Sequence, residues 1–301
     1  MNDTTAYATR HETAVEAGPG TVFGLIADAA GWPQVFAGTV HAEVSEESAT
    51  GHLCRIWQLE GDGVRTWESR RRLDWERRRV SFDLVDPTGP HPPTAGEWQV
   101  GETEEGWSTV VLRLRLALPA HDQEAGRRLR QSVDRRAGAG LAELRTAVQT
   151  GVARAGLQFT FSDSQFVDGT AEDVFGFLDR PDQWPESSVR IRFDDRLTIV
   201  HKELAPPSVI ARQTGRWVVE REGSGARAIY WQTVTLDPVG VFRAFGAWAT
   251  LEEARAGVRR TLGAAGTERL RLAREYAEEL SGRTRPREHG GPEHGGPEHR
   301  E

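Results

Sequence analysis

The sequence predicts an α+β protein of two tandem modules, each a curved antiparallel sheet wrapped on a long C-terminal helix. The first observation behind this prediction is an internal repeat. Residues 22–33 (VFGLIADAAGWP) are matched 152 positions later, from Val22 to Val174, by residues 174–185 (VFGFLDRPDQWP). The second observation is the order of patterns, since each copy begins with an alternating strand and ends with a long apolar-periodic helix. A duplication explains both.

The first copy opens with a strand at 9–17 and a helix beginning at Pro19, a residue suited to the first helical turn. Further strands are predicted at 40–45, 52–60, 64–73, 79–84, 96–101 and 107–118. A long helix is predicted at 122–155. Its apolar residues at helical spacing are Leu129, Val133, Leu141, Leu144 and Val148. This helix has to bury its apolar stripe, and the concave face of a curved sheet is the natural surface for it.

The strand at 64–73 follows Gly61-Asp62-Gly63, a tight-turn signal, and is predicted to be the second strand of a hairpin. One of its faces carries Arg65, Trp67, Ser69, Arg71 and Leu73. Against a solid core Arg71 would be costly to bury unless paired. Against a cavity the same face would line a polar-aromatic pocket, and an edge strand with two wet faces is the third interpretation. A cavity between sheet and long helix favours the pocket.

The second copy is predicted to start with a strand at 158–166 and a helix capped by Thr170. Strands follow at 197–202, 215–221 and 228–236, and a helical region runs from Pro238 to Leu280.

The second copy is shorter than the first. Trp32 and Trp98 are 66 residues apart, whereas Trp184 and Trp217 are 33 apart. Ser69 and Ser188, however, each precede the later tryptophan by 29 residues, so Ser188 and Arg190 match Ser69 and Arg71. Two to three strands are therefore missing after Pro185. Three interpretations stay open: a half-sheet that supports the first copy, a gap filled by the partner domain or a second chain, or residues omitted from the sequence.

We expect domains at 1–156 and 157–281 and a disordered Pro/Gly/His-rich tail at 282–301.

The net charge of −7 and the absence of a long basic block argue against a nucleic-acid partner. The single Cys54 excludes internal disulfides and multi-cysteine metal sites, and no metal is expected. Without an 18-residue apolar run or a signal-peptide pattern, a cytoplasmic protein with no membrane contact is expected.

The duplicated Trp-Pro segments, the strand TWESRR at 66–71 and the segment RQTGRW at 212–217 resemble those of didomain aromatase/cyclases of bacterial aromatic (type II) polyketide biosynthesis. That family belongs to the START/Bet v 1-like (SRPBCC) superfamily of helix-grip folds. The resemblance spans about residues 6–280. It implies a lyase-type cyclase/dehydratase without a redox cofactor, acting in antibiotic biosynthesis. Its reaction would be regiospecific first-ring aldol cyclisation and dehydration of a poly-β-ketone chain, ketoreduced and bound to acyl carrier protein. The ketosynthase and ketoreductase of the same synthase are candidate partners.

The resemblance also assigns roles to residues of the 64–73 strand. It implies that Arg71 and Ser69 are catalytic, and a guanidinium in a dry cavity would stabilise the oxyanions of aldol closure. The candidate substrate-binding residues are Trp67, Arg65, Trp57 and Trp98. Their candidate second-domain counterparts are Ser188, Arg190, Trp217 and Gln232.

We expect the working site in the first domain, because only that copy keeps all its strands. Two alternatives to an enzyme stay open. One is a non-catalytic binding, transport or chaperone module for an apolar or aromatic small molecule, and the other is a scaffold within the synthase.

Overall fold

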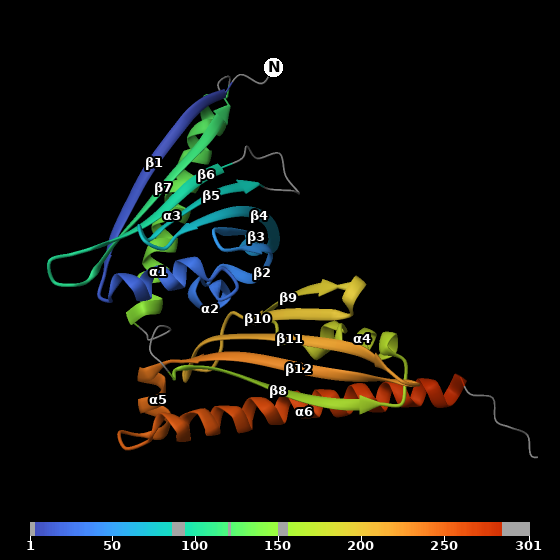
Figure 1. The fold of residues 1–301 in the computed structure, drawn as a ribbon. Coiled ribbons are helices and arrows are strands. Elements are labelled where there is room, and N and C mark those ends of the chain that lie inside the picture. The colour runs from blue at the N-terminus through green and yellow to red at the C-terminus, as the bar shows by residue number, and fades with distance from the viewer. Residues whose placement is uncertain (1–3, 86–93, 120–121, 150–155, 285–301) are drawn as a thin grey trace, which may run out of the picture.

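The computed structural model describes residues 4–85, 94–119, 122–149 and 156–284. Within these residues the chain forms two antiparallel sheets, each accompanied by a long helix (Figure 1). The first sheet has seven strands in the order β1-β7-β6-β5-β4-β3-β2, and the second has five in the order β8-β12-β11-β10-β9. The predicted α+β class with two helix-grip modules is confirmed, as is the shortening of the second copy.

The first module contains three helices and seven strands. Its helices are α1 (Pro19–Ala27), α2 (Trp32–Val35) and α3 (Gln123–Gln149). Its strands are β1 (Thr4–Val15), β2 (Thr39–Ser48), β3 (Gly51–Glu60), β4 (Gly63–Asp74), β5 (Arg79–Val85), β6 (Thr94–Glu102) and β7 (Ser108–Pro119). The turn between β3 and β4 has Gly61 at φ 58°, which a glycine adopts readily.

The second module has the same order of elements without counterparts of β2 and β3. Its strands are β8 (Gln158–Val167), β9 (Ser188–Phe193), β10 (Thr198–Glu203), β11 (Ile210–Glu222) and β12 (Gly225–Leu236). Its helices are α4 (Ala171–Leu178), α5 (Pro238–Phe245) and α6 (Leu251–Thr284), with single 3₁₀ turns at Pro181–Gln183 and Asp194–Arg196. As predicted, Thr170 caps α4, accepting a hydrogen bond from the Asp173 amide at 3.1 Å.

Three predicted elements differ from the structure. The helical region after Pro238 is two helices, because Gly246, at φ 87°, ends α5. Strand β9 was predicted only through its match to β4. Helix α6 continues to Thr284, past the predicted start of the tail at 282, while residues 285–301 and the predicted helical residues 150–155 lie outside the described part.

Strand register relates the two sheets residue by residue. Arg71 on β4 is opposite Phe82 on β5, and Arg190 on β9 is opposite His201 on β10. The numbering difference between Arg71 and Arg190 is the same as that between Trp98 on β6 and Trp217 on β11, so these two tryptophans correspond. The five strands of the second sheet therefore correspond to β1, β4, β5, β6 and β7 of the first.

The first module covers the face of the second sheet that points away from α6. The ammonium of Lys202 on β10 donates to the carbonyl oxygens of Pro33, Phe36 and Thr39 at 2.7, 2.8 and 2.7 Å. The side chain of Gln34 hydrogen-bonds to two threonines of the second sheet. Figure 1 shows α2 and the β2 end of the first sheet lying over β10 and β11. The first module thus packs on the outer face of the shortened sheet, while β9 remains its edge strand.

Among the described helices, none has the length and apolar character needed to cross a membrane. In the same residues, no group of three or more His, Cys, Asp or Glu side chains is arranged to hold a metal ion.

Candidate active site

Four side chains of β4 project from one face of the strand into the first module. Arg65, Trp67, Ser69 and Arg71 alternate along the strand, with steps of about 7 Å between neighbours. Trp67 packs against a small apolar cluster at the β2–β4 end of the sheet, and Ser69 and Arg71 are 3% and 1% exposed. We call these four residues the β4 row. It leads from the partly exposed Arg65 to the buried Arg71.

Arg71 closes the β4 row by binding the last turn of α1. Its Nη1 donates to the Ala27 carbonyl at 3.0 Å and its Nη2 to the Ile26 carbonyl at 2.5 Å. The guanidinium carbon lies 4.7 Å from the centre of the Trp32 ring. A cation is favourable at this end of the helix dipole and over an indole face. Burial lowers the pKa of Arg71 to about 10, so the group stays charged at neutral pH in a fixed orientation.

His52 on β3 lies directly opposite Arg71. The two residues pair across the hairpin, and His52 Nε2 is 3.3 Å from Arg71 Nη1. Burial and, after it, the charge of Arg71 lower the pKa of His52. The imidazole is therefore neutral near pH 7 and able to accept a proton. Ser69 is paired in the same way with Cys54, whose thiol pKa is raised by burial. The cation of Arg71, the neutral imidazole of His52 and the hydroxyl of Ser69 thus lie on two adjacent strands.

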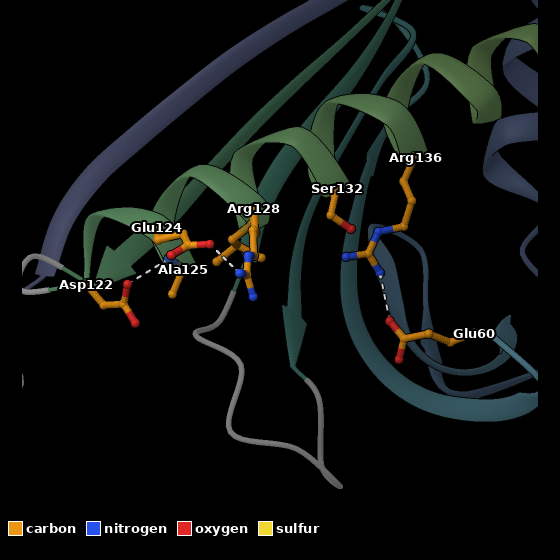
Figure 2. Close-up of a pocket in the computed structure, with 8 residues that line it drawn as sticks. Glu60, Asp122, Glu124, Ala125, Arg128, Ser132 and Arg136 are labelled. Atoms are coloured by element: carbon orange, nitrogen blue, oxygen red, sulfur yellow. Dashed lines mark hydrogen bonds and ion pairs between the residues drawn. The ribbon is translucent and has the colours of Figure 1, made fainter.

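An open cleft of about 380 Å³ lies where the β3–β4 turn approaches α3 (Figure 2). Glu60 from the turn accepts a hydrogen bond from Arg136 of α3 at 3.4 Å and forms an ion pair with Arg65. The cleft therefore adjoins the start of the β4 row. The other residues that line it are Asp122, Glu124, Ala125, Arg128, Leu129 and Ser132. Its lining is mostly charged and includes no residue of the β4 row.

Two of the predicted substrate-binding tryptophans do not belong to this group. Trp57 lies on the opposite face of β3 from Cys54 and packs edge-on against Phe193 of the second module, with ring centres 5.3 Å apart. The prediction that Trp57 lines the cavity is therefore wrong, because strand alternation turns it toward the neighbouring module. Trp98 does face the interior, but it is 7% exposed within the main core between α1 and α3 and is not part of the cleft lining.

Arg190 repeats the geometry of Arg71 in the second module. Its Nη1 donates at 2.7 Å to the carbonyl of Asp179, the residue after α4, and its guanidinium carbon lies 5.6 Å from the Trp184 ring centre. The side chain is 30% exposed, however, because nothing in the second sheet replaces β2 and β3. The other three predicted counterparts, Ser188, Trp217 and Gln232, line a separate cavity of about 350 Å³ between the second sheet and α6.

No protein-family model matches the chain. Curated proteins do match it, and two of them cover nine-tenths of the chain or more. The granaticin polyketide synthase bifunctional cyclase/dehydratase of Streptomyces violaceoruber is 28% identical over 308 residues, covering 91% of this chain and 95% of the relative. The actinorhodin polyketide synthase bifunctional cyclase/dehydratase of Streptomyces coelicolor is 29% identical over 317 residues, covering 90% and 97%. Both alignments are longer than this 301-residue chain, so the relatives carry residues that it lacks.

Two solved structures have the same two-module architecture. The di-domain aromatase/cyclase BexL from the BE-7585A biosynthetic pathway superposes with a TM-score of 0.74 at 28% identity, covering 90% of this chain and 99% of BexL. The chain is thus similar to a two-domain aromatase/cyclase in sequence and in architecture. StfQ, the di-domain aromatase/cyclase from the steffimycin biosynthetic pathway, gives a TM-score of 0.71 at 26% identity, covering 91% and 99%. The similarity extends along nearly the whole length of both structures.

Sequence reasoning did not single out His52 and missed its contact with Arg71. The signal was present in the hairpin. A two-residue turn at Gly61 and Asp62 fixes the register of β3 against β4, and that register puts residue 52 opposite residue 71.

Proposed function

We propose that this chain cyclises and dehydrates a ketoreduced poly-β-ketone chain that is held on acyl carrier protein, with the β4 row and His52 as its working site. The proposal is supported by one observation above all. A guanidinium that is charged at neutral pH is fixed beside a neutral imidazole, in a fold whose relatives are named cyclase/dehydratases. We further propose residues 1–156 and 157–281 as the two domains, with the ketosynthase and ketoreductase of the synthase as partners.

Ring closure needs a base and an oxyanion site. A base removes a proton from a methylene between two carbonyls, leaving an enolate whose carbon attacks a more distant carbonyl carbon. The oxygen of that carbonyl becomes an alkoxide and is protonated, after which the hydroxyl leaves with a neighbouring proton as water. His52 takes and returns the proton at Nε2, exchanging its hydrogen bond with Arg71 Nη1 for one with the substrate, and its lowered pKa keeps it neutral beforehand.

Arg71 stabilises the oxyanions in this scheme. Three of its five N–H groups are engaged by Ala27, Ile26 and His52, which leaves two for the substrate oxygen. Since the guanidinium is already oriented and largely dry, it stabilises developing charge without reorganising. Ser69, one step along the row, is placed to relay a proton. Trp67 gives the substrate chain a flat wall, and Arg65 marks its entrance from the cleft in Figure 2.

The test is a reconstituted synthase in which the product profile is followed. Arg71→Lys keeps the charge but loses the two-pronged geometry, and His52→Gln removes the base. We expect each to slow first-ring formation by about 100-fold. The matched control is Arg190→Lys, the same change at the corresponding helix end of the second module, which should leave the first ring unaffected. Wild-type product profiles from folded Arg71→Lys and His52→Gln variants would refute the assignment.

A further inference from the structure

The second module contains a cavity whose chemistry differs from that of the first. This cavity, of about 350 Å³, lies between the second sheet and α6, within the size range of small-molecule sites. Three of the residues that line it are inward-facing and nearly buried: His201 at 5%, Tyr230 at 6% and Gln232 at 1% exposure. Trp217 forms one wall and Arg269 of α6 reaches in from the helix side.

Register shows what the first module has at the same positions. His201, Tyr230 and Gln232 correspond to Phe82, Leu112 and Leu114 in the first sheet. A histidine, a phenol and an amide have thus replaced three apolar side chains. Burying polar groups costs free energy unless they are hydrogen-bonded. Gln232 is bonded to Gln213 and to the Leu262 carbonyl, so the groups that point to a ligand are those with atoms left unbonded.

One of these buried polar groups, His201, and the neighbouring Trp217 each have an unused hydrogen-bonding atom. His201 Nε2 lies 2.9 Å from the Tyr230 hydroxyl, while its Nδ1 has no hydrogen-bond partner among the described residues. Burial lowers the pKa of His201 to about 3 and raises that of Tyr230, so both groups are neutral near pH 7. In the same described region the Trp217 indole N–H also has no acceptor. A bound molecule with hydroxyl or carbonyl oxygens would satisfy both atoms.

Arg269 brings a positive charge to this cavity. Its guanidinium carbon lies 4.9 Å from the Trp184 ring centre and 5.7 Å from that of Trp217. Within the described residues no carboxylate forms an ion pair with it. The one carboxylate in the lining, Glu203, instead accepts a hydrogen bond from the Ser188 hydroxyl at 2.8 Å. A half-buried guanidinium over two indole faces attracts an anionic, flat ligand.

We propose that the second module binds a planar aromatic ring with acidic hydroxyl groups, a phenol or its enol equivalent. The ring lies beside Trp217, and its oxygens contact Arg269, His201 and the indole N–H. This is a second ligand site, separate from the β4 row. It rests on the proposed function only for the choice of probe, because the ring products of cyclised poly-β-ketones carry such hydroxyls.

The test is calorimetric titration of the full chain with 1,3-dihydroxynaphthalene, and with its dimethyl ether as a ligand that can neither ionise nor donate. Arg269→Met removes the charge. His201→Phe restores the side chain of the first module, where Phe82 lies over Gly96 as His201 lies over Gly215. Ala265→Trp places a bulky side chain at the exposed edge of the cavity and leaves the core untouched. The matched control is Arg271→Met on the outer face of α6, where Arg271 pairs with Glu268 and Glu275.

We expect the diol to bind wild-type protein and the Arg271→Met variant equally. The other three variants should bind the diol about tenfold more weakly than the wild type, or more weakly still. The ether should bind the wild-type protein no more tightly than these variants bind the diol. Equal binding of diol and ether, or diol binding unaffected by Arg269→Met and Ala265→Trp, would overturn the proposal. Because binding is measured without turnover, the two proposals can fail separately. Product profiles that do not change in the Arg71→Lys and His52→Gln variants, together with intact diol binding, would reject the proposed function alone.

Discussion

Lys202 is the only lysine of the chain, and it is buried at the contact between the two modules. From this burial we predict how the free energy of unfolding changes with pH. Burial, followed by repulsion from Arg212 and opposed by Glu143, lowers the pKa of Lys202 from 10.5 to about 7. The unfolded chain therefore holds this proton up to about pH 10, whereas the folded chain releases it near pH 7. Between these limits the unfolded state binds more protons, so the contribution of Lys202 to stability increases as pH rises.

The size of this effect follows from the shift. Each pKa unit corresponds to about 1.4 kcal/mol, and the gain accumulated between pH 7 and pH 9 is about 2 kcal/mol. Lys202→Met lacks the titrating group. We expect the unfolding free energy of the wild type to rise relative to that of the variant by this amount across the interval, in urea unfolding followed by tryptophan fluorescence.

Because there is no second lysine, ¹³Cε-labelled lysine gives a single NMR signal from the side chain whose titration can be followed directly. A midpoint near pH 7 in the folded protein, moving above pH 10 in urea, is the expected result. A folded-state midpoint that stays above pH 10, with parallel stability curves for wild type and Lys202→Met, would refute the reasoning. It would mean that three carbonyl acceptors stabilise the ammonium more than burial destabilises it.

Three further predictions concern stability and can be checked by urea unfolding. Phe193→Ala removes the aromatic contact with Trp57 between the modules and should cost about 2 kcal/mol, so an unchanged midpoint would show that this contact contributes little. Thr170→Ala removes the cap of α4 and should cost about 1 kcal/mol, with Thr170→Ser retaining most of it. Gly240→Ala places a Cβ 1.9 Å from the Ser208 carbonyl oxygen and should cost about 2 kcal/mol or more, whereas a neutral result would mean that this backbone yields easily.

The repeat and the alternation of side chains were enough to predict the modular fold and the row on β4. Strand alternation put Arg65, Trp67, Ser69 and Arg71 on one face whatever the tertiary arrangement. The same reasoning went wrong for Trp57, because alternation says which residues share a face but not what covers that face. The second module lies over the Trp57 face, and no local pattern in β3 signals it.

The cavity of the second module was also hidden from sequence reasoning. Gln232 was singled out from the sequence. His201, Tyr230 and Arg269 were not, because they line one cavity only in the folded arrangement of the second sheet and α6. Spacing of the Trp and Ser residues had shown a shortened copy, which suggested degeneration. Loss of strands and loss of a ligand site are separate events, however, and the inward side chains of the remaining strands are the basis of the proposal that only strands were lost.

Arg71 and Arg190 each bind the C-terminal end of a short helix, α1 and α4, and this bears on how related chains are identified from sequence. In both modules the tryptophan of the Trp-Pro pair donates its N–H to the carbonyl six residues earlier, and an arginine lies near the tryptophan ring. This assembly persists in the module that has lost two strands. Its residues therefore have the same structural role in both modules, and their presence alone does not identify a catalytic module. Sorting catalytic from non-catalytic modules requires the positions where the duplicated halves have diverged.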